Sequence, residues 1–438
     1  MRVLLVGGGG RENAIGEALV RSGAELYVVS KHRNPGLVRL AKEYGLAKET
    51  DVPKVLEFAE KWGIDIAFIG PESPLEKGIV NAFEEKGIPA VGPTKEAAQL
   101  ETNKAFARSL MERYEIPGRK LFRVFDDISG MRSWMDDFGR PVVVKPLGLT
   151  GGKGVKVVGH QLRDNGEAKA YAEELIRKDG KVLIEERTEG VEFTFQVFTD
   201  GKRVIPMPLA QDYPHAYEDD KGPITGGMGS YSCSSHLLPF VPREDYEKAL
   251  ETLKATVEAM RKNGTPYRGI LYGQFMLSKD GPVIIEYNAR FGDPEAMNVL
   301  PLLKTSLLDI AEGIVDGNLG KAEFENKATV VKYLAPRGYP LSPVRGVKVE
   351  VDEKAVEDAG ARLYYASIDE SFTLLGSRAI AVVGIADTLE EAERIAEKAV
   401  PHVRGELFYR RDVGTRESVE KRVRTMREFG REFEPNSC

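Results

Sequence analysis

Residues 3–23 read VLLVGGGGRENAIGEALVRSG, and this stretch decides the fold of the N-terminal part of the chain. The apolar run predicts a short buried strand, the glycines a tight turn, and the segment after them a helix that ends at Gly23. The pattern then repeats, because the apolar runs ELYVV, IDIAFIGP and IPAVGP alternate with the amphipathic segments VPKVLEFAEKWG and LEKGIVNAFEEKG. Strands separated by helices predict an α/β domain with a doubly wound parallel sheet.

A strand, a glycine turn and a helix are also typical of dinucleotide binding. That fingerprint needs Gly-x-Gly-x-x-Gly and an acidic residue at the end of the second strand. Gly7 and Gly9 supply two glycines, but Glu12 occupies the third place and Ser30 ends the second strand. Both departures disfavour a dinucleotide. Three interpretations remain open: backbone N–H groups that bind a lone phosphate or phosphoribosyl group, a tight turn without a ligand, and, least favoured, a dinucleotide site.

Composition narrows the class of protein. The 438 residues are enough for roughly two to four domains, and a formal net charge of −6 gives no bulk basicity for nucleic-acid binding. No apolar run approaches the length of a membrane span, so no membrane partner is expected. Cys233 and Cys438 are too few for a disulfide framework or a multi-cysteine zinc site, which favours a reducing, cytoplasmic setting. The C-terminal EFEPNSC is expected to be frayed.

The remainder of the chain predicts α+β units. Within residues 120–199, the strands PVVVK, VKVVG, KVLIEER and EFTFQVFT accompany one helix over about 167–178. A long helix near 245–263 and the hairpin GILYGQFMLSKDGPVIIEYN follow. From about residue 328, several short strands and the helix TLEEAERIAEKAV predict a small C-terminal α+β unit.

The segment VVVKPLGLTGGKGVKVV, residues 142–158, predicts a phosphate-binding loop. Lys145 ends a buried strand, and the glycines around Lys153 lead into another strand. It is not a Walker A loop, because neither Ser nor Thr follows the lysine and no helix follows the loop. Glycines let the backbone approach phosphate oxygens, and lysines supply the charge. The alternative is a bare hairpin turn, but a lysine at the end of an apolar strand is costly without a partner.

The segment VIIEYNARFGDPE, residues 283–295, predicts a metal site. Glu286 and Asn288 alternate along a strand and therefore share a face, and two oxygen donors there suit Mg²⁺ or Mn²⁺. Arg290 continues this face and is suited to pair with a carboxylate or a phosphate. Gln274, on the preceding strand, is a candidate for a further oxygen ligand. The alternative is a hairpin with exposed polar alternation.

Two polar segments allow two interpretations each. In KVLIEERTEGVEF, Glu185, Glu186 and Glu192 suit a nucleotide ribose or form a solvated acidic turn. In AQDYPHAYEDDKGPITGGMGSYS, Asp212 and the glycine cluster at 226–229 are placed to close over a substrate or form a mobile surface loop.

Taken together, these motifs resemble the phosphoribosylamine–glycine ligase (glycinamide ribonucleotide synthetase) family of ATP-grasp enzymes. The resemblance runs from about residue 1 to 416 and includes GPESPLEKGIV, GPTKEAAQLETNKAF, GPITGGMGSYS and IEYNARFGDPE. It implies ATP-dependent ligation of glycine to 5-phosphoribosylamine through glycyl phosphate, in purine biosynthesis, with Mg²⁺ or Mn²⁺ as cofactor. Its partners are then glycine, phosphoribosylamine and ATP. Two segments depart from the family pattern: RENA replaces REHA, and the residues after QDY differ from QDHKR.

The resemblance also implies roles for individual residues. For ATP binding it implies Lys104, Lys145, Gly151, Gly152, Lys153, Gly154, Glu185, Glu186, Thr188 and Glu192. For metal binding it implies Glu286 and Asn288, with Gln274 in the place of a further ligand. For substrate binding it implies Gly8, Gly9, Gly10, Glu12, Asn13, Asp212, Gly226, Gly227 and Arg290. The catalytic set is Arg290, Asp212 and Lys145.

The resemblance implies an ATP-grasp fold between two other units. We expect a Rossmann-like substrate domain over 1–101, an ATP-grasp domain over 102–327 with a lid at about 120–190, and a C-terminal α+β domain over 328–438. Because glycyl phosphate hydrolyses readily, a closing lid is expected, and the glycine loops 151–154 and 222–229 are the candidates. The sequence does not distinguish a monomer from a homodimer.

Overall fold

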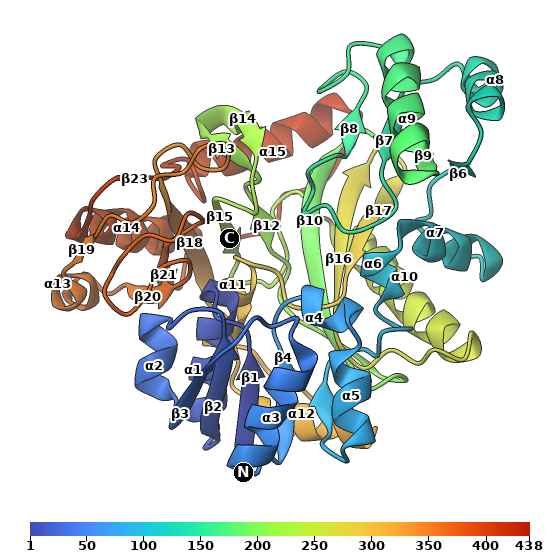
Figure 1. Cartoon of the computed structure of the whole chain (residues 1–438). Helices are drawn as coiled ribbons and strands as arrows, with labels where there is room; N and C mark the ends of the chain where they lie inside the picture. Colours follow the sequence, from blue (N-terminus) through green and yellow to red (C-terminus); the bar gives the residue numbers. More distant parts are fainter.

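A five-stranded parallel sheet forms the N-terminal part of the computed structural model, which describes residues 1–438 (Figure 1). The strand order is β3-β2-β1-β4-β5, as expected for a doubly wound sheet. The order reverses between β1 and β4, so the carboxyl ends of these two strands border a crevice in which such sheets bind ligands. The elements are β1 (Arg2–Val6), α1 (Gly10–Arg21), β2 (Glu25–Ser30), α2 (Pro35–Leu40), β3 (Glu43–Leu46), α3 (Val52–Trp62), β4 (Ile66–Ile69), α4 (Ser73–Glu76), α5 (Ile79–Glu85) and β5 (Ala90–Val91).

The lid is a separate small unit with its own core. Its antiparallel sheet has the order β6-β9-β7-β8, and a cluster of 13 buried apolar residues lies between this sheet and its two helices. We keep the name lid for this unit; that it closes stays a prediction. The elements are α6 (Gln99–Thr102) and α7 (Lys104–Arg113), which lead into it, then β6 (Phe122–Phe125), α8 (Ile128–Phe138), β7 (Val142–Lys145), β8 (Lys156–Val157), α9 (Asn165–Asp179) and β9 (Val182–Glu186).

A central antiparallel sheet with the order β11-β10-β16-β17 lies beside the lid in Figure 1. Its register places Gln274 opposite Glu286 and Tyr272 opposite Asn288, so these four side chains share one face. Helix α10 packs against β10, β16 and β17. The elements are β10 (Val191–Thr199), β11 (Val204–Pro206), α10 (Arg243–Lys262), β16 (Gly269–Ser278), β17 (Gly281–Asn288), α11 (Ala296–Val299), η2 (Leu300–Leu302) and α12 (Leu307–Asp316).

The C-terminal sheet combines strands from distant parts of the chain. Its order is β12-β15-β18-β21-β20, with β23 also paired to β18. Strands β12 and β15 precede residue 300, whereas the others follow it, so the segment that contains β12 and β15 is joined to the C-terminal part by backbone hydrogen bonds. The elements are β12 (Gln211–Asp212), β13 (His215–Tyr217), η1 (Glu218–Asp220), β14 (Lys221–Ile224), β15 (Gly229–Ser232), β18 (Ala328–Pro336), β19 (Glu350–Val351), α13 (Glu353–Asp358), β20 (Arg362–Tyr365), β21 (Ile380–Ala386), α14 (Leu389–Ala399), η3 (Val400–His402), β22 (Val403–Arg404), β23 (Leu407–Phe408) and α15 (Arg416–Glu428).

The C-terminal tail differs from its prediction. Instead of fraying, it is fixed by a disulfide between Cys233 and Cys438, residues 205 apart in sequence. The Asn436 amide also donates hydrogen bonds to the carbonyl oxygens of Leu238 and Val241. The sequence showed two cysteines but not their proximity, which depends on the tail packing back across the molecule. A cytoplasmic location inferred from the cysteine count therefore stays a prediction. None of the helices has the length and apolar character needed to span a bilayer.

We expect the Cys438→Ser variant to unfold at a lower temperature than the wild type. A cross-link over 205 residues restricts the unfolded chain, and its removal typically costs about 2–4 kcal/mol. The measurement is thermal unfolding followed by circular dichroism, with and without a thiol reductant. The reductant should lower the midpoint of the wild type and leave that of the variant unchanged; equal midpoints for the two proteins without reductant would contradict the expectation.

Candidate active site

A cavity of about 970 Å³ lies where the lid, the central sheet and the C-terminal sheet meet. Its wall includes Lys145 from β7, Glu286 from β17, Asp212 from β12 and Arg378, which precedes β21. A narrower cavity of about 100 Å³ adjoins it, shares Lys145 and Glu286, and adds Lys104. Side chains from all three sheets therefore converge on two adjoining cavities.

Another cavity, of about 570 Å³, lies between α15 and the C-terminal tail. It shares no lining residue with the two adjoining cavities. It also contains none of the site residues expected from the sequence. The candidate site is therefore the pair of adjoining cavities, where several buried charged groups gather.

A buried carboxylate organises the cations at the lid side of this site. Glu185 on β9 is fully buried and accepts a hydrogen bond from the Arg108 guanidinium. Its other oxygen lies 2.9 Å from Nζ of Lys145 and 3.6 Å from Nζ of Lys120. Burial alone would raise the pKa of Glu185, but the three cations outweigh burial and hold that pKa well below its usual range. Glu185 thus fixes two lysines at the wall of the cavity.

Burial also changes the lysines themselves. It lowers the pKa of Lys120 to about 8; the charge of Glu185 opposes this shift, while Lys145 and Arg108 add repulsion. Burial likewise lowers the pKa of Lys104, whose ammonium donates a 2.7 Å hydrogen bond to the carbonyl oxygen of Gly148. Three ammonium groups therefore border the cavities, which is the charge that a polyphosphate requires.

Glu286 and Asn288 form the oxygen-rich edge predicted from strand alternation. Both line the two cavities, and the Asn288 amide lies 3.5 Å from a Glu286 carboxylate oxygen. Glu286 forms no ion pair, so its carboxylate is available to a divalent cation. No cluster of three or more His, Cys, Asp or Glu side chains suited to a metal occurs in the chain. The residues present therefore fit a metal that completes its shell with phosphate oxygens and water.

Gln274, the candidate third ligand, is already engaged. Its Nε2 donates a 2.9 Å hydrogen bond to Glu192, and its Oε1 accepts one of 2.7 Å from the Tyr272 hydroxyl. The Thr194 hydroxyl also donates to Oε1 of Gln274, with 3.3 Å between the two oxygen atoms. Metal ligation by Gln274 would need to break these contacts and stays a prediction. Burial raises the pKa of Glu192, an effect that its hydrogen bond from Gln274 partly offsets.

Arg290 is held between two acids that the sequence did not single out. Its Nε lies 3.1 Å from Glu72, which follows β4, and its Nη2 lies 3.1 Å from Glu101 on α6. Burial would raise the pKa of Glu72, but Arg290 and Arg11 outweigh it and lower that pKa to about 2. Burial dominates at Glu101 and raises its pKa to about 7. The two acids fix the guanidinium at the edge of both cavities.

Asp212 and Glu295 form an acidic corner of the large cavity. Burial raises the pKa of Asp212, and the neighbouring charges of Glu295 and Glu192 raise it further. Burial also raises the pKa of Glu295, although Oγ1 of Thr194 lies only 3.1 Å from one of its oxygens. No arginine or lysine forms an ion pair with either carboxylate. The corner therefore suits a small ligand that carries a positive charge.

Arg378 connects the glycine cluster to the C-terminal sheet. Its Nη1 donates to the carbonyl oxygens of Gly226, Gly227 and Asp293 at 2.9, 3.1 and 2.7 Å. The Asp293 carboxylate accepts a 2.7 Å hydrogen bond from the Tyr333 hydroxyl. Burial would lower the pKa of Arg378, but the charge of Asp293, together with Tyr333, Tyr339 and Glu295, raises that pKa above its usual value. These contacts fix the Gly226–Gly227 turn, of which Gly226 lines the cavity.

The N-terminal glycine loop is filled by side chains of the chain itself. The Glu12 carboxylate accepts a 2.9 Å hydrogen bond from the Gly9 N–H and pairs with Arg11. A Cβ on Gly10 would lie 2.3 Å from the Tyr333 hydroxyl. Asn13 is buried, and its Oδ1 accepts a hydrogen bond from the Tyr365 N–H. None of these residues except Arg11 lines the large cavity. Substrate contacts of Gly8, Gly9, Gly10, Glu12 and Asn13 stay predictions.

The predicted ATP residues of the lid divide into three groups. Lys145, Gly151, Gly152 and Thr188 line the large cavity. Glu185 lines only the narrower cavity, and three residues line neither of the two; these are Lys153, Gly154 and Glu186. The Glu186 carboxylate accepts a 2.9 Å hydrogen bond from the Leu121 N–H, because successive residues of β9 point to opposite faces.

For the segment over 222–229, the sequence left open a loop that closes over a substrate and a mobile surface loop; the structure shows a turn with defined contacts. The segment runs from β14 to β15, and its turn is fixed by Arg378. Gly229 has φ +159, and a Cβ there would lie 2.4 Å from the carbonyl oxygen of Val331. Gly229 therefore serves close packing against β18. Of the two candidate lids, only the loop at 151–154 belongs to a unit with its own core.

Several charged residues of the site escaped sequence reasoning. Glu72 gave a weak signal, since GPES directly follows an apolar strand at the sheet's switch point. The others contact partners far away in the sequence and gave no local signal; these are Arg11, Glu101, Arg108, Lys120, Asp293, Glu295 and Arg378.

Comparison with known proteins identifies relatives over the whole chain. Models of the phosphoribosylglycinamide synthetase family match in three parts: the N domain at residues 1–101, the ATP-grasp (A) domain at 102–296 and the C domain at 329–416. The phosphoribosylamine–glycine ligase of Thermococcus gammatolerans is 83% identical over 438 residues, which is 100% of each chain. That of Thermococcus kodakarensis is 77% identical over 427 residues, 98% of this chain and 99% of its own.

The architecture also matches a solved structure. The crystal structure of phosphoribosylamine–glycine ligase from Thermotoga maritima has a TM-score of 0.78 and 28% sequence identity to this chain. The match covers 94% of this chain and 100% of that one. The ATP-grasp architecture expected from the motifs is therefore confirmed.

We expect Glu185→Gln to destabilise the protein strongly. The substitution leaves Arg108, Lys120 and Lys145 buried without a counter-charge, and breaking a buried ion pair costs about 3–5 kcal/mol. The readout is the urea midpoint of unfolding. The control is Glu186→Gln on the opposite face of the same strand, where the loss should be about 1 kcal/mol. Similar midpoints for the two variants would refute a central role of Glu185.

Proposed function

Because the chain belongs to the phosphoribosylglycinamide synthetase family, we propose that it ligates glycine to 5-phosphoribosylamine with ATP, forming glycinamide ribonucleotide, ADP and phosphate. The observation that carries this proposal is the convergence of three lysines, the Glu286–Asn288 edge and Arg290 on adjoining cavities. That set suits phosphoryl transfer, in which a protein contributes alignment and charge neutralisation.

The lid side of the cavity is the proposed ATP site. Lys104, Lys120 and Lys145 border the space for the phosphates, and Gly151 and Gly152 allow the lid backbone to approach them. Glu286 and Asn288 would hold Mg²⁺ or Mn²⁺, with Gln274 opposite as a possible further ligand. Such an ion, when bound, neutralises charge on the phosphates between which the bond breaks. Thr188 and Glu192 line the same cavity and remain proposed contacts of the nucleoside.

Glycine is proposed to bind between Arg290 and the acidic corner. The Arg290 guanidinium is fixed by Glu72 and Glu101 and suits the glycine carboxylate. The carboxylates of Asp212 and Glu295 have no cation partner and suit the glycine ammonium group. Opposite charges at the two ends of the site match a small zwitterion.

Phosphoribosylamine is proposed to approach from the crevice between β1 and β4. Arg11, at the start of the helix after β1, and Arg378 both line the large cavity. These guanidiniums, with the backbone of Gly8–Gly10, are the proposed contacts of its phosphate. Its amine would then face the acidic corner, where glycine is held.

The reaction proceeds in two steps. A glycine carboxylate oxygen attacks the γ-phosphorus of ATP, the bond to the β-phosphate oxygen breaks, and ADP leaves. The amine nitrogen of phosphoribosylamine then attacks the carbonyl carbon of glycyl phosphate; the C–O bond breaks, phosphate leaves, and the nitrogen loses a proton. Lys145 and Arg290 stabilise the charge on the phosphoryl group and on the departing phosphate. The lid must exclude water while glycyl phosphate is present.

The direct test is ADP formation with each substrate omitted in turn. Sustained turnover should require glycine, phosphoribosylamine and a divalent cation together. Replacement of glycine by bicarbonate with equal turnover would instead indicate an ATP-grasp carboxylase. Saturable fluorescence quenching by NADH would point to the dinucleotide interpretation that Glu12 and Ser30 disfavour.

Glu286→Gln should lower kcat by on the order of 10²–10³, because a carboxylate that holds the metal becomes a neutral amide. Mn²⁺ binding in the presence of ATP, followed by electron paramagnetic resonance, should weaken in parallel. Glu258→Gln, on the exposed side of α10, is the matched control. Undiminished turnover by Glu286→Gln would exclude Glu286 as a metal ligand.

The rate should also fall in alkaline solution. The pKa of Lys120 is about 8, so its charge is present below that pH and is lost as pH rises through it. We therefore expect kcat/KM for ATP to decline above pH ~8, since this ratio reports groups of the free enzyme. Lys120→Gln should be slower than the wild type below pH ~8, should lack this decline, and should approach the wild type above it. An unchanged profile in the variant would show that another group titrates.

A further inference from the structure

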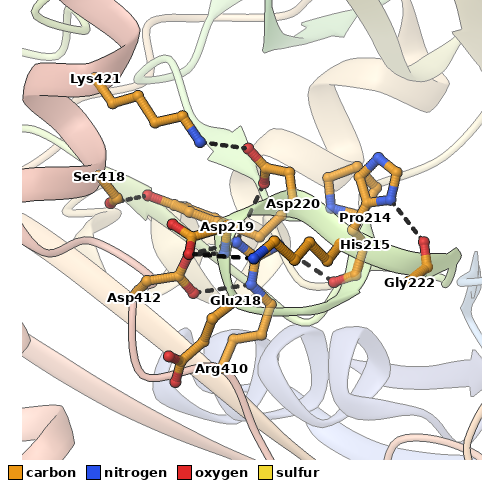
Figure 2. A network of polar contacts seen from close by, with 12 residues as sticks. Pro214, His215, Glu218, Asp219, Asp220, Gly222, Arg410, Asp412, Ser418 and Lys421 are labelled. Carbon is orange, nitrogen blue, oxygen red and sulfur yellow. Dashed lines mark hydrogen bonds and ion pairs between the residues drawn. The ribbon is translucent and has the colours of Figure 1, made fainter. Parts of the chain in front are cut away.

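The β13–β14 hairpin, residues 215–224, pairs with no other strand. A two-stranded hairpin alone is at best marginally stable in water, so contacts from elsewhere must hold it. These contacts come from residues 410–422, a segment that includes the first half of α15 and lies about two hundred residues further along the chain (Figure 2). We call this segment the strap.

Asp220, at the tip of the hairpin, is the centre of the contact with the strap. The Arg422 guanidinium donates to both of its carboxylate oxygens, at 2.6 and 3.1 Å. Arg410 donates to it at 3.1 Å, and the Lys421 ammonium lies 3.9 Å away. Burial would raise the pKa of Asp220, but these cations outweigh it and lower that pKa to about 2. The carboxylate is therefore charged at neutral pH and joined to three cations.

Arg410 connects the tip to the base of the hairpin. Its side chain is fully buried and donates to both carboxylate oxygens of Asp412, at 2.9 and 2.6 Å. It also donates a 3.2 Å hydrogen bond to the carbonyl oxygen of His215 and lies over the ring of Tyr213, 4.9 Å from its centroid. One guanidinium thus contacts the hairpin at two points, Asp220 and His215, while it also pairs with Asp412 of the strap (Figure 2).

The tip has a backbone conformation that needs such support. Asp219 and Asp220 have φ values of 59 and 58, in the left-handed region that residues with a side chain rarely adopt. The Asp219 N–H donates a 3.1 Å hydrogen bond to Asp412, and the Arg411 N–H donates one of 3.2 Å to Glu218. A strained turn persists only where surrounding contacts determine it, and here the strap supplies them.

The inner side of the hairpin faces the catalytic cavity. Pro214, His215, Ile224 and Thr225 line the 970 Å³ cavity, whose opposite wall is the lid. Cγ2 of Ile224 lies 4.0 Å from the position that a Cβ on Gly152 would occupy, so the lid's glycine loop already contacts the hairpin. The hairpin is therefore the edge against which this loop would close.

We propose that Asp220, clamped by Arg410 and Arg422, is a positioning residue that fixes the hairpin as the docking edge for the closing lid. The proposal rests on the proposed ligase function, because its effect on catalysis concerns glycyl phosphate. With the edge displaced, water reaches the intermediate: a water oxygen attacks the carbonyl carbon, the C–O bond to phosphate breaks, and glycine and phosphate are released. ADP then forms without product.

The first readout is the coupling of ATP use to product. In the wild type, ADP and glycinamide ribonucleotide should form in equal amounts. In Asp220→Asn, kcat should fall by on the order of tenfold, as expected for a small displacement, and more ADP than product should form. Asp220→Glu keeps the charge and should restore much of the coupling. Equal ADP and product in Asp220→Asn would overturn the proposal.

Asp245→Asn is the matched control. Asp245 on α10 is a buried carboxylate paired with Arg431, and it lines neither adjoining cavity. Loss of this ion pair should lower the unfolding temperature, while ADP and glycinamide ribonucleotide should still form in equal amounts. An equal loss of coupling in this control would mean that general destabilisation, not hairpin position, causes the leak.

The second readout does not depend on ligase activity. Lys153 lies exposed in the glycine loop, where trypsin can cleave after it. ATP with Mg²⁺ should protect this bond in the wild type by closing the lid, and should protect it several-fold less in Asp220→Asn. Equal protection of the two proteins overturns the proposal even if both ligate glycine. A wild type that is protected but does not ligate glycine would instead contradict the proposed function. Should Asp220→Asn fail to fold, Arg422→Lys weakens the same clamp and serves in both assays.

Discussion

The carboxylate of Glu185 is the interaction on which the lid side of the site depends. Three cations from different elements converge on it: Arg108 from α7, Lys120 ahead of β6 and Lys145 from β7. Without it, these charges would repel one another in a space from which water is largely excluded. The arrangement keeps ammonium groups close together before any phosphate arrives. The site therefore needs little rearrangement to accept a polyanion, which is the basis of electrostatic preorganisation.

Opposite charges also define the rest of the cavity. Arg290 is fixed between Glu72 and Glu101, whereas Asp212 and Glu295 lack a cation partner. One part of the site thus has its charges balanced within the protein, and the other holds two carboxyl groups without a cation partner, whose pKa values burial raises. In the proposed function, this division would orient glycine by its charges, because a glycine molecule has too few atoms for orientation by shape.

Local patterns in the sequence predicted the elements of the fold and the groups that lie on strands. The repeating strand–helix pattern gave the parallel sheet, and alternation along one strand put Glu286 and Asn288 on a common face. Contacts between distant segments were not predictable in this way. Arg290 meets Glu101 across 189 positions, and Cys233 meets Cys438 across 205. Glycines can serve either mobility or close packing, and the sequence does not tell these apart; Gly229 serves close packing. The domain boundaries at 101 and 327 stay predictions.

The shared C-terminal sheet limits how this protein can be divided. Strand β15 pairs with β18, so the backbone of the glycine-cluster segment finds its hydrogen-bond partners beyond residue 327. A fragment cut at that point would keep the three cavity lysines and the Glu286–Asn288 edge. It would expose the unpaired N–H and C=O groups of β15, and such an exposed strand edge is prone to aggregation. The C-terminal part is therefore not an exchangeable module. Recombination between relatives would preserve the sheet only where β12, β15 and β18 are inherited together.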